Sequence, residues 1–135
     1  MSLLPPLVEA ADIDAEDDIW RRIPGIRSHL TYDHDNRRWR PSSAAFEDHG
    51  DDDAMSALLA REDTPDRATA GRWAGAFLAV LKAAVYRGDK QLIVRDPTPE
   101  EPSHLGVIGP KPKSVRRRWA EKASWVSEPN LTPPA

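Results

Sequence analysis

Apolar residues are grouped in short runs that are bounded by glycine, proline or acidic residues. Such runs predict strands, and they lie at residues 43–47, 55–59, 91–95 and 104–108. A further run, at 19–23, is interpreted as a short strand or a turn that enters the domain. We expect 43–47 and 55–59 to form a hairpin across the acidic turn between them, with the last two strands pairing with these two. Because alanine is a poor strand former, a helix over 54–61 is the alternative. Residues 27–41 are polar and of mixed charge, and we interpret them as a loop.

Two other segments have the residue spacing of a helix. Thr64 is a good N-cap, and the apolar residues between Trp73 and Val85 recur on one helical face. Ser114 is a second good N-cap, and apolar residues follow it at helical spacing. The sequence therefore predicts two main helices, over about 65–87 and 114–126.

Together these elements predict an α+β fold, in which a small, largely antiparallel sheet packs on the two main helices and the tails are irregular. The chain length fits one domain. We place this single α+β domain at residues 19–127. An acidic N-terminal segment at 1–18, either mobile or folded back, precedes it, and a proline-containing tail at 128–135 follows it.

Composition excludes several classes of function. The chain has no cysteine, which excludes disulfide frameworks, thiolate zinc sites and cysteine nucleophiles. No apolar run reaches the roughly 18 residues of a membrane span, and the first residues lack the basic start of a signal peptide. We therefore expect a cytoplasmic protein without membrane contact. No cofactor is expected. The segment from Gly106 to Ser114 does not have the spacing of a phosphate-binding loop and its prolines remove backbone donors, which leaves an isolated anion site there as the alternative.

The formal net charge of -3 is unevenly divided along the chain. Residues 1–66 hold 7 Lys/Arg and 16 Asp/Glu, giving -9, whereas residues 67–135 hold 12 Lys/Arg and 6 Asp/Glu, giving +6. The acidic residues are densest before residue 19 and at 47–53. We interpret the N-terminal acidic segment as a solvated tail or short helix or, alternatively, as a cover for basic surface elsewhere in the fold.

The basic residues are densest at the predicted start of the last helix. A helix N-terminus carries partial positive charge, so cations there need compensation from an acidic partner or a bound phosphate. The alternative is that they extend into water, with Arg117 pairing with Glu121. Trp39 between two arginines is a weak indication of single-stranded nucleic acid, which the net acidic charge opposes. The candidate anion-binding residues are Arg40, Lys111, Lys113, Arg116 and Arg117.

Ser43 and His104 are the candidate catalytic residues, as a nucleophile and a base. No G-x-S-x-G motif surrounds Ser43. His104 follows a proline-rich loop, and its alternative role is to hydrogen-bond that loop. Three other histidines, His29, His34 and His49, lie near aspartates, but no known ligand spacing is present, so no metal site is predicted.

Several stretches resemble an uncharacterised bacterial protein family with no known activity. The most distinctive is R-P-S-S-A-A-F at 40–46; the others are W-R-R-I-P at 20–24, M-S at 55–56, D-P-T-P-E-E-P-S-H at 96–104, G-P-K at 109–111 and K-S at 113–114. The resemblance spans most of residues 20–126. It implies an independent small domain with the acidic N-terminal segment outside the shared part, and it implies no mechanism.

Two functions follow as hypotheses. The charge division favours a small accessory module that binds another macromolecule, a protein or a nucleic acid, through the basic helix start. The alternative is an enzyme that acts on nucleotide or RNA phosphates, with arginines holding the phosphate and with Ser43 and His104 doing the chemistry. The enzyme hypothesis requires that Ser43, His104 and an arginine meet in one cleft. Both leave the oligomeric state open.

Overall fold

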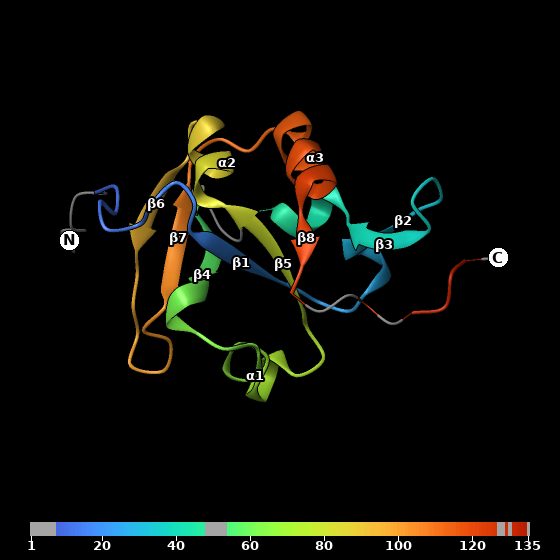
Figure 1. Ribbon diagram of the computed structural model, residues 1–135, viewed down its shortest axis with the longest axis horizontal. Helices are drawn as coiled ribbons and strands as arrows, with labels where there is room; N and C mark the ends of the chain where they lie inside the picture. Colours follow the sequence, from blue (N-terminus) through green and yellow to red (C-terminus); the bar gives the residue numbers. More distant parts are fainter. Residues whose placement is uncertain (1–7, 48–53, 127–128, 130, 135) are drawn as a thin grey trace, which may run out of the picture.

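The computed structural model of the chain describes residues 8–47, 54–126, 129 and 131–134. Its main feature is a six-stranded antiparallel sheet in the order β6-β7-β4-β1-β5-β8 (Figure 1). The strands are β1 (Asp18–Ile23), β4 (Ala54–Leu59), β5 (Phe77–Lys82), β6 (Leu92–Arg95), β7 (His104–Ile108) and β8 (Ser124–Trp125). A separate two-stranded sheet is formed by β2 (Leu30–Asp33) and β3 (Arg38–Pro41). The predicted α+β class with a largely antiparallel sheet is confirmed.

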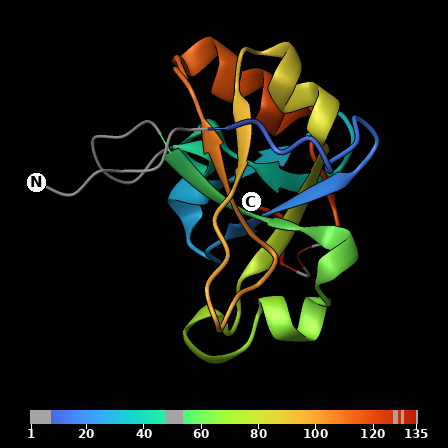
Figure 2. The same ribbon diagram turned by 90° about the vertical axis from the view of Figure 1, so that its left-hand side faces the viewer.

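Helices lie on both faces of the large sheet. The main helices α2 (Ala83–Gly88) and α3 (Lys113–Lys122) cover one face, and α1 (Pro65–Ala68) lies on the other (Figures 1 and 2). Side chains alternate along β1, so Ile19 and Ile23 enter the main core with Trp119, whereas Trp20 packs in a second cluster with Ala68. Short 3-10 turns are η1 (Arg27–His29), η2 (Ser43–Phe46), η3 (Ala60–Glu62) and η4 (Gly71–Trp73).

The predicted helix over 65–87 is wrong. Thr64 caps a helix as expected, accepting a hydrogen bond from the Arg67 backbone N–H at 3.3 Å, but α1 is only four residues long. The helix ends at Ala68, and Gly71 and Gly75 adopt positive φ angles of 59° and 83°, which are incompatible with a right-handed helix continuing through 71–75. The apolar run that follows is β5, which has a core cluster on each face. A strand buried on both faces loses polar alternation and resembles a buried helix in sequence.

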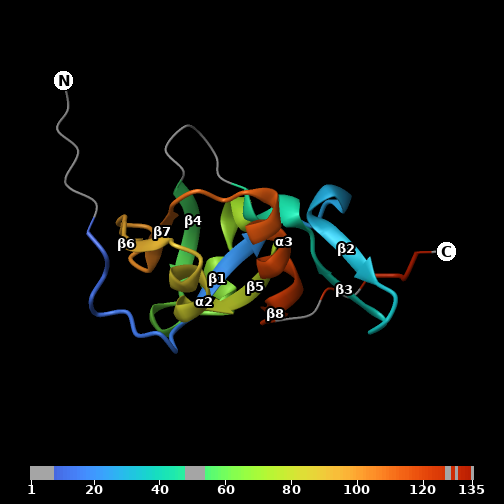
Figure 3. The same ribbon diagram turned by 90° about the horizontal axis from the view of Figure 1, so that it is seen from above.

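Two shorter predictions are also corrected. The predicted strand at 43–47 is instead the turn η2 followed by its C-cap residue Glu47, so the expected hairpin with 55–59 does not form. The acidic turn of that hairpin, at 48–53, lies outside the described residues. Residues 27–41 are not a loop but contain the β2–β3 hairpin, which projects from the end of the molecule opposite β6 (Figure 3). The Asp33 carboxylate orders its turn by accepting the backbone N–H groups of Asp35 and Asn36.

The last helix and four of the strands agree better with the predictions from the sequence. The strands predicted at 19–23, 55–59, 91–95 and 104–108 correspond to β1, β4, β6 and β7. The helix predicted over 114–126 begins at Lys113, with Pro112 rather than Ser114 at its N-cap position, and ends at Lys122. The chain then forms β8, which pairs with β5 at the edge of the sheet.

The described part of the N-terminal segment runs beside the outer edge of β6 (Figures 1 and 3). The Ala10 backbone N–H donates to the Ile93 carbonyl at 2.8 Å, and the Ile93 N–H donates to the Glu9 carboxylate at 2.7 Å. Ala10 and Ile13 belong to the main core. The segment thus protects hydrogen-bonding groups that an edge strand would otherwise expose.

Candidate functional site

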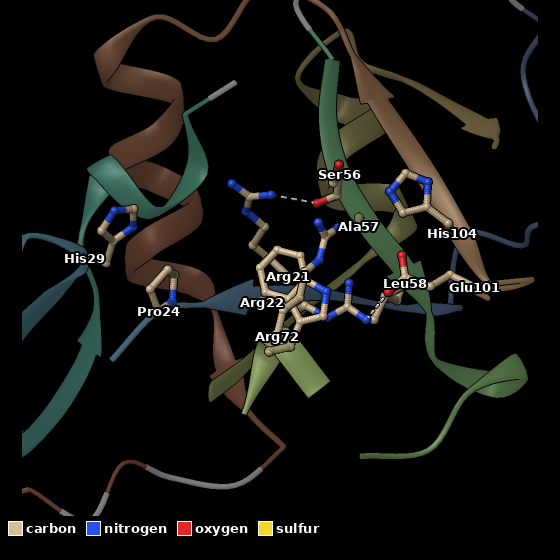
Figure 4. Close-up of a pocket in the computed structure, with 11 residues that line it drawn as sticks. Arg21, Arg22, Pro24, His29, Ser56, Ala57, Leu58, Arg72, Glu101 and His104 are labelled. Carbon is tan, nitrogen blue, oxygen red and sulfur yellow. Dashed lines mark hydrogen bonds and ion pairs between the residues drawn. The ribbon is translucent and has the colours of Figure 1, made fainter. Parts of the chain in front are cut away.

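A cleft lies where β1 and β4 stop pairing. β1 pairs with β5 along its whole length but with β4 only at Ile19↔Leu59 and Trp20↔Leu58. Beyond Trp20 there is a cavity of about 180 Å³, which we call the β1–β4 cleft (Figure 4). Its lining consists of Arg21, Arg22, Pro24, His29, Ser56, Ala57, Leu58, Arg72, Trp73, Glu101 and His104. These residues come from three strands and from the loops around them.

Arg21 forms a structural part of the cleft. Its side chain is only 6% exposed and donates hydrogen bonds to the carbonyls of Ser56 (2.8 Å), Ala45 (3.0 Å) and Glu47 (3.3 Å). The Ser56 carbonyl belongs to β4, so this guanidinium links the two strands where the backbone ladder has ended. Arg21 therefore holds the cleft open rather than offering its donors to a ligand.

Arg22 and Arg72 both pack on Trp73. Their guanidinium carbons lie 4.6 Å and 4.9 Å from the ring centroid, within cation–π distance. Arg22 is further held by the Ala68 carbonyl at 2.6 Å and by an ion pair with Glu101. Arg72 is exposed, and among the described residues its guanidinium has no ion pair or hydrogen bond. Arg72 is thus the cation of the cleft with donors available for a ligand.

His104 is the first residue of β7, and its imidazole is oriented by one residue. Its Nδ1 lies 3.0 Å from the Asp96 carbonyl oxygen and 3.1 Å from the Asp96 carboxylate. Since both neighbours of Nδ1 are acceptors, we assign the proton of the neutral ring to Nδ1 and the lone pair to Nε2. The opposite edge of the ring faces the cleft beside Ser56 (Figure 4).

The β4–β7 register explains why Ser56 and His104 are neighbours. Leu58 is paired with His104, and Ser56 is paired with Gly106. Positions two residues apart on a strand share a face, so Ser56 and His104 project from adjacent strands into the same space. Ser56 is exposed, and no hydrogen bond of its hydroxyl is found within the described part of the chain.

Of the two predicted catalytic residues, only one lies in the same cleft as an arginine. His104 lines the cleft, but Ser43 begins η2 and does not. Ser56 stands beside His104 in its place. Sequence reasoning also missed Arg22, Arg72 and Glu101. The one local signal for Ser56 is its polar side chain between Met55 and Ala57 in a predicted strand, which indicates an exposed face.

The predicted anion-binding residues lie outside this cleft and do not act as one group. Lys111 donates to the Gly109 carbonyl at 3.0 Å. Arg116 donates to the Lys111 carbonyl at 3.0 Å and forms a 2.9 Å ion pair with Glu47. Lys113 and Arg117 are exposed on α3, and Arg40 lies on β3. The basic helix start is therefore compensated in part by the protein itself.

Within the described ranges, no three His, Asp or Glu side chains are grouped as metal ligands would be, while His49 falls outside them. None of the helices in these ranges has the length and apolar character needed to cross a membrane. No family model matches the chain, and no match was found among curated proteins or solved structures. The resemblance to a bacterial family stays a prediction.

Proposed function

We propose that this protein binds a ligand that carries a phosphate group, such as a nucleotide or an RNA, in the β1–β4 cleft. The observation that supports the proposal is the convergence of Arg22, Arg72 and His104 on one cavity whose single acidic residue, Glu101, is already paired with Arg22. Arg72 then adds a net positive charge, and guanidinium groups bind phosphate with two parallel hydrogen bonds.

The size of the cleft limits what it can enclose. Its volume of about 180 Å³ is smaller than the roughly 300–1,000 Å³ of pockets that enclose a whole drug-sized ligand. One phosphate and its immediate substituents fit this space, and the remainder of a nucleotide or RNA would lie outside, near the exposed Arg72. The proposal therefore concerns recognition of a phosphate rather than of a base.

The test is calorimetric titration with inorganic phosphate, adenosine monophosphate and a short oligouridine, with acetate as the carboxylate control. Arg72→Ala should weaken phosphate binding about tenfold or more, because a hydrogen bond to a charged group contributes roughly 1.5–3 kcal/mol. Arg117→Ala is the matched control: Arg117 is also exposed, but it lies on α3 outside the cleft. Equal effects of both substitutions, or tighter binding of acetate than of phosphate, would contradict the proposal.

A second candidate function is favoured by the charge left exposed on α3. Arg116 and Arg118 are paired with Glu47 and Asp89, but for Lys113 and Arg117 no ion pair occurs in the part of the chain that the structure describes. This surface supports an accessory module that binds an acidic protein or a nucleic acid through the start of α3. The doubly substituted Lys113→Ala, Arg117→Ala protein should then lose the partner.

Salt separates the two kinds of partner. Nucleic-acid binding through this surface should weaken steeply between 50 and 200 mM salt, since phosphate contacts release counterions. Affinity capture at low and high salt measures this difference. Retention of a protein at both salt concentrations would argue against the nucleic-acid version, and full retention by the doubly substituted protein would argue against this surface.

A further inference from the structure

We infer that Ser56 is a nucleophile activated by His104 and that the β1–β4 cleft catalyses phosphoryl transfer. The inference rests on the proposed function, since it takes the phosphate held in the cleft as the group that is attacked. It assigns a reaction to the site and replaces Ser43 with a serine that the sheet places beside the histidine.

The pairing of β4 with β7 places the side chains of Ser56 and His104 on the same face of the sheet. Ser56 on β4 and His104 on β7 lie on the same face of neighbouring strands, two register positions apart on the diagonal. Such diagonal neighbours have Cα atoms about 7–8 Å apart, which long side chains bridge. Both residues line the cleft, and Figure 4 shows the imidazole on the Ser56 side of β7. The serine hydroxyl and the imidazole therefore border the same cleft.

Asp96 gives His104 the tautomer that a general base needs. The carbonyl and the carboxylate of Asp96 both approach Nδ1, at 3.0 Å and 3.1 Å, so Nε2 keeps the lone pair. The backbone also fixes this loop, because the Asp96 N–H donates to the His104 carbonyl at 3.0 Å. Asp96 is a positioning residue, since it acts only through the ring of His104. The same logic of nucleophile, base and orienting acid recurs on unrelated folds.

The arginines supply the remaining requirement, which is stabilisation of charge on the phosphoryl oxygens. Arg22 is fixed by Glu101, Ala68 and Trp73, so its guanidinium is held in one orientation. Arg72 approaches the same cavity from η4. Cationic donors placed near the developing charge lower the barrier to phosphoryl transfer.

The reaction balances with water as the only co-reactant. Ser56 Oγ attacks phosphorus, the Oγ–P bond forms and the ester P–O bond breaks. The Ser56 proton passes to His104 Nε2 and then to the leaving oxygen, which departs as an alcohol. Water next attacks the phosphoserine and gives its proton to Nε2, the Oγ–P bond breaks, and the proton returns to Ser56 as phosphate leaves.

A fluorophosphonate probe tests the nucleophile without knowledge of the natural substrate. Attack by Ser56 forms an Oγ–P bond and releases fluoride, and peptide mass spectrometry locates the label. We expect the label on Ser56 in the full chain and in Ser43→Ala, and no label at this site in Ser56→Ala. His104→Ala should slow labelling at least a hundredfold and Asp96→Asn at least tenfold, as is usual for loss of general-base catalysis.

A structural role for His104 is separated from a catalytic one by rescue. Added imidazole should restore labelling of Ser56 in His104→Ala if the ring acts as a base. If the ring only ties down the loop, imidazole has no effect, and this result would overturn the inference. Label on other serines at the rate seen for Ser56 would overturn it as well.

The same samples are titrated with inorganic phosphate to separate this inference from the proposed function. Ser56→Ala should still bind phosphate, because the arginines remain. If the full chain binds phosphate but Ser56 is not labelled, the inference is overturned and the proposed function stands. If Ser56 is labelled but phosphate does not bind, both the proposed function and the phosphoryl class of the reaction are overturned.

Discussion

Arg21 and Arg22 are neighbours in β1, yet strand alternation gives them different roles. Arg21 reaches the carbonyls of η2 and β4, on the side of the main core. Arg22 reaches the opposite face, where it meets Ala68 and Glu101. Both line the cleft because it lies between β1 and β4. One dipeptide thus supplies two arginines that the protein fixes on opposite faces of the strand.

Asp89 shows how a single carboxylate fixes the main core. It accepts hydrogen bonds from Arg118 Nη2 at 2.7 Å and from Nε1 of the fully buried Trp119 at 2.8 Å. Asp89→Ala leaves the buried indole N–H without a partner, and we expect a loss of about 1–3 kcal/mol in the free energy of unfolding at pH 7. Urea denaturation measures this loss. Asp35→Ala, in the exposed β2–β3 turn, is the control and should change little.

The same carboxylate predicts a dependence on pH. Burial raises the pKa of Asp89, but the hydrogen bonds from Arg118 and Trp119, together with the positive charges of Arg118 and Lys122, outweigh it and hold the pKa below its ordinary value. A group whose pKa is lowered by folding adds stability above its unfolded pKa, about 3.9 for aspartate. The stability difference between the wild-type chain and Asp89→Ala should therefore shrink as the pH falls below about 4. A difference that grows on acidification would contradict this account.

At the scale of the elements, the turn between β7 and α3 requires a glycine at position 109. Its φ is 153°, and a Cβ there would lie 2.9 Å from the Lys90 carbonyl oxygen and 3.0 Å from the Gln91 side chain. We expect Gly109→Ala to lower the free energy of unfolding by about 1–3 kcal/mol, the usual cost of backbone strain with a steric conflict. Gly88→Ala in α2 meets no atom within 4 Å and should be neutral or slightly stabilising. Equal effects in thermal unfolding would show that the turn relaxes.

The elements that the sequence predicts correctly are those that depend on residues close together in the chain. The apolar runs at β1, β4, β6 and β7 and the cap at Thr64 are read directly from neighbouring residues. The run in β5 resembles a helix in sequence, because Leu78 and Val80 pack on one face of the strand and Ala79 and Leu81 on the other. The burial of β5 on both faces depends on segments that are distant in the sequence. The spacing of its own apolar residues does not show this burial.

The candidate site was predicted only in part for the same reason. His104 and arginine-based anion binding were expected, but the arginines were placed at α3 and the serine at position 43. Which serine meets His104 depends on the register of β4 with β7, and which arginines meet it depends on the splayed β1 and the η4 turn. These are long-range pairings.

At the scale of the whole molecule, many of the opposite charges of the two halves of the chain form ion pairs with each other. Acidic residues of the first half pair with cations of the second half in several places: Glu9 with Arg87, Asp12 and Glu62 with Arg95, Asp18 with Lys82, and Glu47 with Arg116. The described acidic segment thus covers Arg87 and Arg95 rather than the start of α3. Among the described cations, no ion pair is found for Arg72 or for Lys113 and Arg117 of α3, nor for Arg37 and Arg40 of the β2–β3 hairpin and Lys90.

Glu9 protects the edge strand β6 from pairing with another chain. Its carboxylate accepts the Ile93 N–H of β6 and pairs with Arg87. Glu9→Ala should expose the β6 edge, lower the free energy of unfolding by about 1–2 kcal/mol, and promote self-association. Analytical ultracentrifugation and urea denaturation measure both effects. Glu16→Ala removes the same charge from the same segment at an exposed position and should leave the chain unchanged.

The most direct test of the central claim is an NMR titration of the isotope-labelled chain with inorganic phosphate. The account predicts that the Nε signals of Arg22 and Arg72, the Trp73 indole signal and the His104 amide shift together and saturate at one affinity. The amides of Lys113 and Arg117 should stay in place. Shifts confined to the start of α3, or no saturable shift in the cleft, would contradict the account.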